Sequence, residues 1–193
     1  SQGANGQWSV AAQVGPTESS ATFALTSGVR VRVKPMTQGV APADWQPSHT
    51  FRVDPNPQVL IVNGFDRVLD GSYGHLSHDF TAIVGEASPV GVATVDHRSL
   101  IEDGFDPSPY AGLIWLSGDQ STLDQTITSD EQQVLRTYLS NGGHLIVSGS
   151  EVGYDLTGQA TAPGFVAQVL GATYSQDDSN SHSAVGAGAR RSG

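Results

Sequence analysis

A continuous apolar run, Val59-Leu60-Ile61-Val62, constrains the fold of this chain more than any other feature of its sequence. A strand with apolar side chains at consecutive positions is buried on both faces, as in a parallel sheet that is covered by helices on both sides. Similar runs follow and alternate with helix-like segments. Strands are predicted at 59–62, 90–95, 112–116 and 144–148, and helices at 74–87, 129–140 and 163–170. This alternation predicts an α/β domain with a mostly parallel, doubly wound sheet.

The helix predicted at 129–140 carries the clearest local signals. Thr128 and Glu131 have the spacing of a capping box, in which each residue satisfies a free backbone N–H of the other. Asn141-Gly142-Gly143 follows the last apolar position and supplies the left-handed residue that commonly ends a helix.

Pro55-Asn56-Pro57 indicates a boundary, because neither a helix nor a central strand continues through two prolines. Before it, apolar and polar residues alternate, which is typical of short antiparallel strands. We therefore expect a small all-β segment at residues 1–55, the α/β domain at 58–178 and a flexible tail at 179–193. The α/β domain lacks an expected last strand, which a second chain could supply. The strands of the β segment are predicted at 8–13, 21–26, 29–35 and 49–53.

Composition excludes several classes of function. The chain has 19 acidic and 9 basic residues and a net charge of −10, which disfavours binding to nucleic acid. No apolar stretch is long enough to insert into a membrane. The absence of cysteine excludes disulfides, thiolate metal sites and a cysteine nucleophile. The richness in small polar residues, with Lys34 as the single lysine, favours an exported bacterial protein of the periplasm, cell envelope or extracellular space.

A carboxylate follows every predicted parallel strand: Asp66, Asp96, Asp119 and Glu151. The carboxyl ends of parallel strands meet at one edge of the sheet, where ligands bind, so these acids are expected to lie near one another. Carboxylates that lie close together repel one another unless a cation, an arginine or shared protons offset their charge.

Three ways of relieving this charge remain open. Asp66, Asp96 and Glu151 could hold a divalent cation, which would then be the cofactor of the protein. Arg67 or Arg98, which lie in the same turns, could form an ion-pair network with the acids. Alternatively, a carboxyl group with a raised pKa could act as a general acid.

The pentapeptide Gly149-Ser150-Glu151-Val152-Gly153 resembles a nucleophile elbow, the sharp turn that lifts a reactive side chain above a sheet. Glu151 occupies the raised position and could act as nucleophile, base or ligand. Alternatively, Ser150 is the reactive group with His97 as its base, oriented by Asp96 or Asp119.

Several segments together carry a family resemblance. They are 63–67, 114–122, Glu131-Gln132, Gly142-Gly143 and 148–156. They resemble the flavodoxin-like module of secreted bacterial proteins associated with xanthan lyases and N-acetylmuramoyl-L-alanine amidases, which is similar to class I glutamine amidotransferase domains. The resemblance covers about residues 59–178, and the upstream strands resemble the latter half of a fibronectin type III module.

The resemblance implies a secreted, modular protein that associates with polysaccharide or peptidoglycan. Amidotransferases carry a catalytic cysteine at the elbow, where this chain has Glu151, so glutaminase activity is not expected. We expect an accessory or non-catalytic cell-envelope module with an acidic strand-end site. The alternative is a hydrolase of peptidoglycan or polysaccharide that uses Glu151 with Asp119 or Asp66, or a metal held by the strand-end acids.

Overall fold

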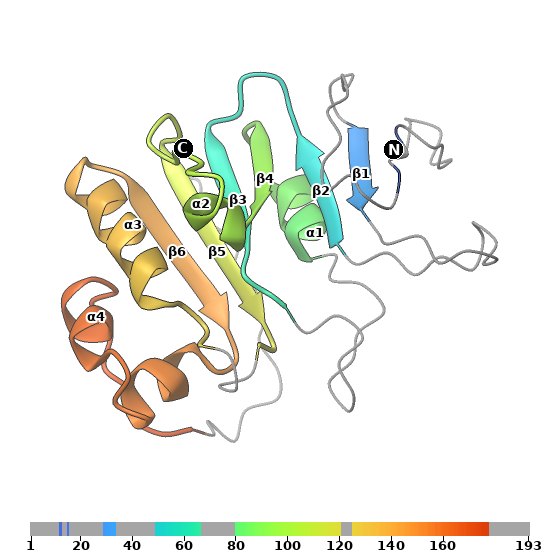
Figure 1. Ribbon diagram of the computed structural model, residues 1–193. Coiled ribbons are helices and arrows are strands. Elements are labelled where there is room, and N and C mark those ends of the chain that lie inside the picture. Colours follow the sequence, from blue (N-terminus) through green and yellow to red (C-terminus); the bar gives the residue numbers. More distant parts are fainter. Residues whose placement is uncertain are drawn as a thin grey trace, which may run out of the picture.

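The structure is a computed structural model that describes residues 12, 15, 29–33, 49–66, 80–120 and 125–177. Strands and helices alternate along most of this length, and one six-stranded sheet organises them (Figure 1). The strands are β1 (Val29–Val33), β2 (His49–Val53), β3 (Val59–Asn63), β4 (Val92–Asp96), β5 (Gly112–Gly118) and β6 (His144–Gly149). The helices are α1 (Phe80–Ala87), α2 (His97–Ile101), α3 (Ser129–Ser140), the π-helical η3 (Tyr154–Gly158) and α4 (Pro163–Gln168).

Four neighbouring strands of the sheet run parallel to one another, in the order β4-β3-β5-β6. The predicted α/β class is thus confirmed, and the order is compatible with a flavodoxin-like fold. The chain first moves from β3 to β4 on one side and then to β5 on the other. The order therefore reverses between β3 and β5, and we call this place the switch point.

The two strands before the prolines belong to the same sheet. β2 runs antiparallel to β4 with Val53 opposite Ala93, and β1 runs antiparallel to β2. The Arg52 backbone N–H donates to the Thr94 hydroxyl at 2.6 Å, which strengthens this joint. The sheet therefore continues across the boundary predicted at Pro55, and the fibronectin-like character of residues 1–55 stays a prediction.

Other predicted parts of the chain fall outside the described residues. The strands expected at 8–13 and 21–26 do so, apart from Ala12, and so do the first residues of the helix expected at 74–87 and the tail at 179–193. Within the described residues β6 pairs only with β5, and no further strand follows it up to residue 177.

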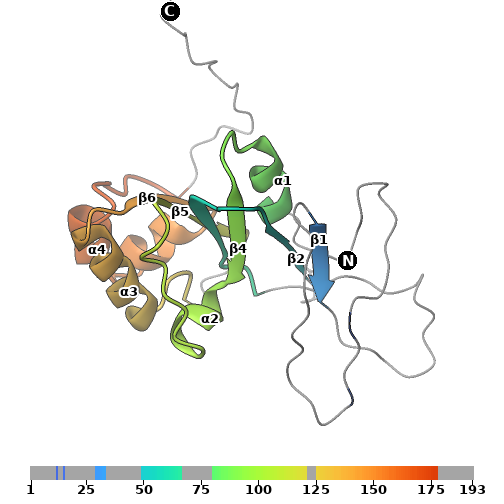
Figure 2. The same ribbon diagram turned by 90° about the horizontal axis from the view of Figure 1, so that it is seen from above.

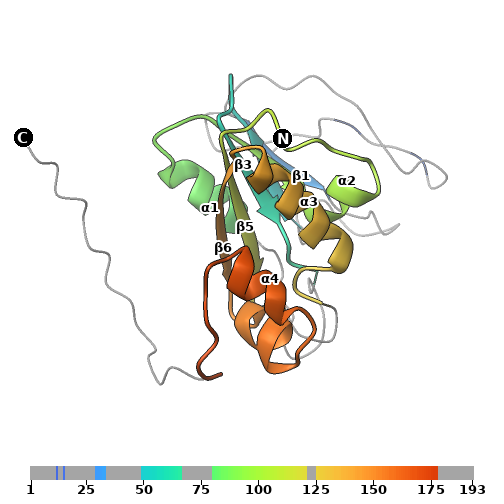
Figure 3. The ribbon, with the colours of Figure 1, turned by 90° about the vertical axis from the view of Figure 1, so that its left-hand side faces the viewer.

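Helices cover the sheet from both sides, as the doubly wound pattern requires (Figures 2 and 3). α1 lies on one face, where it covers a small cluster around Ile61, Val92 and Leu116. α2 and α3 lie on the opposite face, over a larger core that includes Leu60, Trp115 and the residues of α3 that point inward. In the described parts of the chain, no helix is both long and apolar enough to cross a membrane.

Helix α3 follows its sequence signals closely. It spans Ser129–Ser140 as predicted, with Thr128 as its N-cap and both hydrogen bonds of the capping box present. Gly142 adopts a φ of 89° after the helix end, which is the conformation that glycine permits. Two helical segments were not predicted, namely the short α2, which begins directly after β4, and η3, which follows β6.

Candidate functional site

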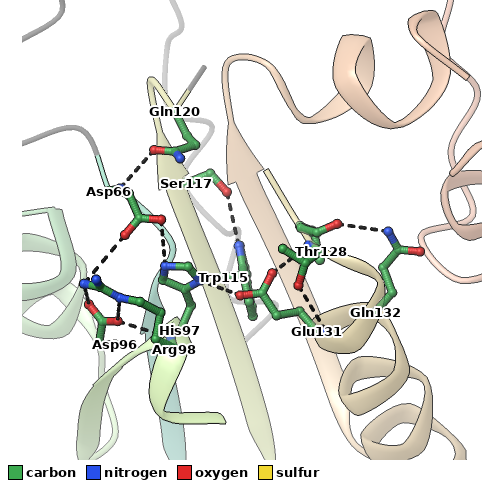
Figure 4. Close-up of polar contacts among 11 residues, drawn as sticks. Asp66, Asp96, His97, Arg98, Trp115, Ser117, Gln120, Thr128, Glu131 and Gln132 are labelled. Atoms are coloured by element: carbon green, nitrogen blue, oxygen red, sulfur yellow. Dashed lines mark hydrogen bonds and ion pairs between the residues drawn. The ribbon is translucent and has the colours of Figure 1, made fainter. Parts of the chain in front are cut away.

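At the carboxyl edge of the sheet, the imidazole of His97 lies between two carboxylates, those of Asp66 and Glu131 (Figure 4). His97 Nε2 lies 2.9 Å from Asp66 Oδ2, and His97 Nδ1 is hydrogen bonded to Glu131 Oε1. The Nε2 contact has the distance of a hydrogen bond without its alignment, so we describe it as an ion pair. We call these residues the His97 clamp.

Three separate elements position the clamp. Asp66 follows β3, His97 is the first residue of α2 directly after β4, and Glu131 lies in the first turn of α3. Asp96 starts α2, because its side chain accepts a hydrogen bond from the Arg98 backbone N–H at 3.2 Å. The clamp therefore ties together two strand ends and a helix that covers the sheet.

Glu131 has two roles in this arrangement. Its Oε2 accepts the Thr128 backbone N–H at 2.7 Å, which completes the capping box, while its Oε1 bonds to His97. The side chain is 3% exposed, so its charge is almost fully removed from water. Sequence analysis identified Glu131 as a helix cap and missed it as a partner of His97.

The two carboxylates determine the charge of His97. Burial on its own lowers the pKa of this histidine, but the close contacts and the negative charges of Asp66 and Glu131 outweigh that effect and raise the pKa to about 10. The ring is therefore an imidazolium cation at neutral pH. A histidine in this state cannot accept a proton as a general base.

Arg98 forms an ion pair with Asp96, the acid at the end of β4. Its Nε lies 2.9 Å from Asp96 Oδ1, and its guanidinium also lies 3.7 Å from Asp66 Oδ1. The hydrogen bond to Asp96 is the main reason that the pKa of Arg98 is raised. Asp66, Asp96, His97 and Arg98 thus form the ion-pair network that was one of the three alternatives for this edge.

The metal hypothesis gains no support from this geometry. Among the described residues, no group of three or more histidine, aspartate or glutamate side chains is placed to hold a metal ion. Asp66 and Asp96 face cationic side chains instead, and Glu151 lies after a different strand. Arg67 lies outside the described residues.

Buried side chains lie at the switch point beside the clamp. The Asp66 backbone N–H donates to Gln120 Oε1 at 2.9 Å, and Gln120 is 1% exposed. Trp115 Nε1 donates to the Ser117 hydroxyl at 3.1 Å, and the Trp115 ring meets His97 edge-on with 6.1 Å between ring centroids. Gly64 makes room for Trp115, because a Cβ there would lie 2.6 Å from Trp115 Nε1. Gln120 was another residue that sequence analysis missed.

Glu151 lies in a separate neighbourhood, at the turn that follows β6. Gly149, the last residue of β6, permits a close approach to β5, since a Cβ there would lie 2.7 Å from the Ser117 Cβ. Burial and, secondarily, the negative charges of Asp177 and Asp155 raise the pKa of the half-buried Glu151. The geometry therefore brings together Asp66 and His97 of the predicted catalytic set, while the charges that act on Glu151 are those of Asp177 and Asp155.

Asp119 and the serine alternative complete the predicted set. Asp119 is half-buried in the turn directly after β5. Ser150 is exposed, and its backbone N–H donates to Gly118 O at 2.8 Å. Both nitrogens of His97 face carboxylates, so His97 is not placed to serve Ser150 as a base.

Comparison with known proteins does not assign a family to this chain. No protein-family model, curated protein or solved structure matches the chain.

Proposed function

We propose that this chain is a non-catalytic accessory module of an exported bacterial protein that associates with the cell envelope or with polysaccharide. The observation that carries the non-catalytic part is the His97 clamp, in which a buried imidazolium lies between Asp66 and Glu131. The cell-envelope and polysaccharide association comes from the sequence resemblance.

The clamp supports a structural role because it satisfies the groups that a reaction would need to have free. Catalytic acids and bases work best with a pKa near the operating pH, whereas the pKa of His97 is about 10. The buried side chains of Trp115 and Gln120 also lie at the switch point, where open α/β sheets commonly bind small ligands.

One observation favours a hydrolase as the second candidate. Glu151 is half-buried on a sharp turn, and its pKa is raised by burial and by the charges of Asp177 and Asp155. A carboxyl group in this state could donate a proton to a leaving group. Asp119 follows β5, the strand that pairs with β6, whereas Asp66 follows β3, so Asp119 is the nearer in strand order of the two predicted partner carboxylates.

Turnover measurements separate the two candidates. Purified wild-type protein and the Glu151→Gln variant are incubated with peptidoglycan and, separately, with xanthan, and released reducing ends and soluble muropeptides are quantified. The exposed Glu102→Gln variant serves as the matched control. We expect no release above the buffer blank with any of the three proteins. Release by wild type and Glu102→Gln that is lost in Glu151→Gln would overturn the accessory function in favour of the hydrolase.

A further inference from the structure

Two tyrosine rings form an aromatic surface beyond the end of β6. The Tyr154 and Tyr174 ring centroids lie 6.5 Å apart, with the ring planes at 50°. Tyr154 is 37% exposed, and Tyr174 is half-buried. Neither ring contributes to the hydrophobic core on either face of the sheet.

Both rings pack closely against the backbone at glycines. A Cβ at Gly158 would lie 2.6 Å from Cδ2 of Tyr154, and one at Gly153 would lie 3.2 Å from the Tyr174 ring. Each ring therefore rests directly on the backbone at a position where a larger residue would displace it. Rings held in this way lose little conformational freedom when a ligand packs on them.

Glu151 lies beside this surface. Its carbonyl accepts the backbone N–H of Asp155 at 2.8 Å, so Glu151 begins the turn that carries Tyr154. Burial is the main reason that the pKa of the Tyr174 phenol is raised, and the nearby charges of Asp177 and Glu151 and the Tyr154 phenol add to it. The two rings and the Glu151 carboxyl group therefore share one small region.

This combination matches the chemistry of a sugar ring. One face of a pyranose presents C–H groups that pack on an aromatic ring, and its rim presents hydroxyl groups that donate to carboxylates and phenols. The nearby acids and the net charge of −10 repel an acidic glycan and leave a neutral one as the occupant. The region also lies at the carboxyl end of a parallel strand, where α/β proteins bind ligands.

We propose that Tyr154, Tyr174 and Glu151 form a binding subsite for a neutral glycan, in which a sugar ring packs on the tyrosines and donates hydroxyl hydrogen bonds to Glu151. This inference rests on the proposed polysaccharide association and assigns that association to a place on the molecule. It requires binding without cleavage.

Titration with chitotetraose, the neutral tetramer of N-acetylglucosamine, tests the subsite. Binding to the full chain is followed by calorimetry and by NMR of the tyrosine ring signals. We expect saturable shifts of the Tyr154 and Tyr174 signals, and affinity reduced about fivefold or more in Tyr154→Ala but kept in Tyr154→Phe. Ile146→Ala, which removes an apolar side chain that is 62% exposed on β6, is the control and should bind like wild type.

Other outcomes would overturn the proposed subsite. Absence of binding, equal affinity in wild type and Tyr154→Ala, or shifts confined to signals other than those of the two tyrosines would overturn the subsite. Binding of tetragalacturonate as tight as that of chitotetraose would overturn its neutral specificity. If Tyr154→Ala does not fold, the wild-type ring shifts still test the proposal. Cleavage of chitotetraose would refute the accessory function, whereas loss of tyrosine-dependent binding alone would refute only the subsite.

Discussion

The backbone N–H of Asp66 donates a hydrogen bond to the Gln120 side chain at 2.9 Å, across the place where the order of the parallel strands reverses. Gln120 is buried, so this bond fixes the loop after β3 to the loop after β5. Asp66 in turn contacts His97, so Gln120 helps to position a residue of the His97 clamp.

Gln120→Leu should therefore destabilise the protein. Leucine keeps most of the volume but accepts no hydrogen bond, so the Asp66 N–H loses its partner, at a cost of about 1–2 kcal/mol in the free energy of unfolding. Urea denaturation measures the change. The control is Gln133→Leu on the exposed side of α3, which should change stability by less than about 0.5 kcal/mol. Equal effects of the two substitutions would contradict the role of Gln120.

Because of His97, the free energy of unfolding should fall as the pH rises above neutrality. Its folded pKa of about 10 lies above its ordinary value of 6.5, so its contribution is complete below pH 6.5. The contribution is then lost as the pH rises through about 10, because the unfolded chain has already released the proton. We expect the free energy of unfolding to fall between these limits more steeply in wild type than in His97→Gln. Parallel pH profiles for the two proteins would contradict this assignment.

The same group can be observed directly by NMR. The imidazole signals of His97 should not titrate between about pH 5.5 and 8.5. A His97 signal that titrates near its ordinary value would show that the clamp does not hold the ring as an imidazolium.

Glu131 and Thr128 should separate helix capping from the electrostatics of the clamp. Glu131→Gln keeps an acceptor for the Thr128 N–H but removes the charge that faces His97, so the pKa of His97 should fall. Thr128→Ala removes the hydroxyl cap and should cost about 1 kcal/mol of stability, with little effect on the pKa of His97. The NMR titration and urea denaturation of both variants provide the comparison, and a His97 pKa that falls equally in both would contradict the separation.

Alanine substitutions at two glycines should affect stability differently. A Cβ at Gly143 would lie 2.3 Å from the buried Tyr138 ring, so Gly143→Ala should destabilise by about 1–3 kcal/mol. A Cβ at Gly164 in α4 would come no closer than 4.0 Å to a neighbour, so Gly164→Ala should leave stability unchanged or raise it by about 0.5 kcal/mol. Thermal unfolding of both variants measures the difference, and destabilisation by Gly164→Ala as large as that by Gly143→Ala would contradict it.

The parts of the fold that sequence predicts well are those with local causes. Buried strands appear as apolar runs, and the bounds of α3 follow from the Thr128 cap and the glycines after Asn141. α2 escaped prediction because its five residues carry two ionisable side chains and a single buried leucine. The pairing of β2 with β4 joins residues 53 and 93, and no local pattern encodes a contact over that distance.

The candidate site shows the same division. Sequence places carboxylates after every strand, and the topology alone then brings Asp66 near His97. The bond from His97 to Glu131 depends on how α3 is set against the sheet, a relationship that is absent from the spacing of residues 34 positions apart. For the same reason, sequence grouped Glu151 with Asp66, although the charges that act on Glu151 in the structure are those of Asp177 and Asp155.

The antiparallel contact of β2 with β4 has a practical consequence for work with this protein. A shortened chain that starts at Gln58, where the sequence suggests the domain begins, would leave the backbone groups along one side of β4 without their neighbour. Exposed strand edges of this kind pair readily with other molecules. In the intact chain β2 thus shields β4 from intermolecular strand addition, and a fragment without it should be prone to aggregation.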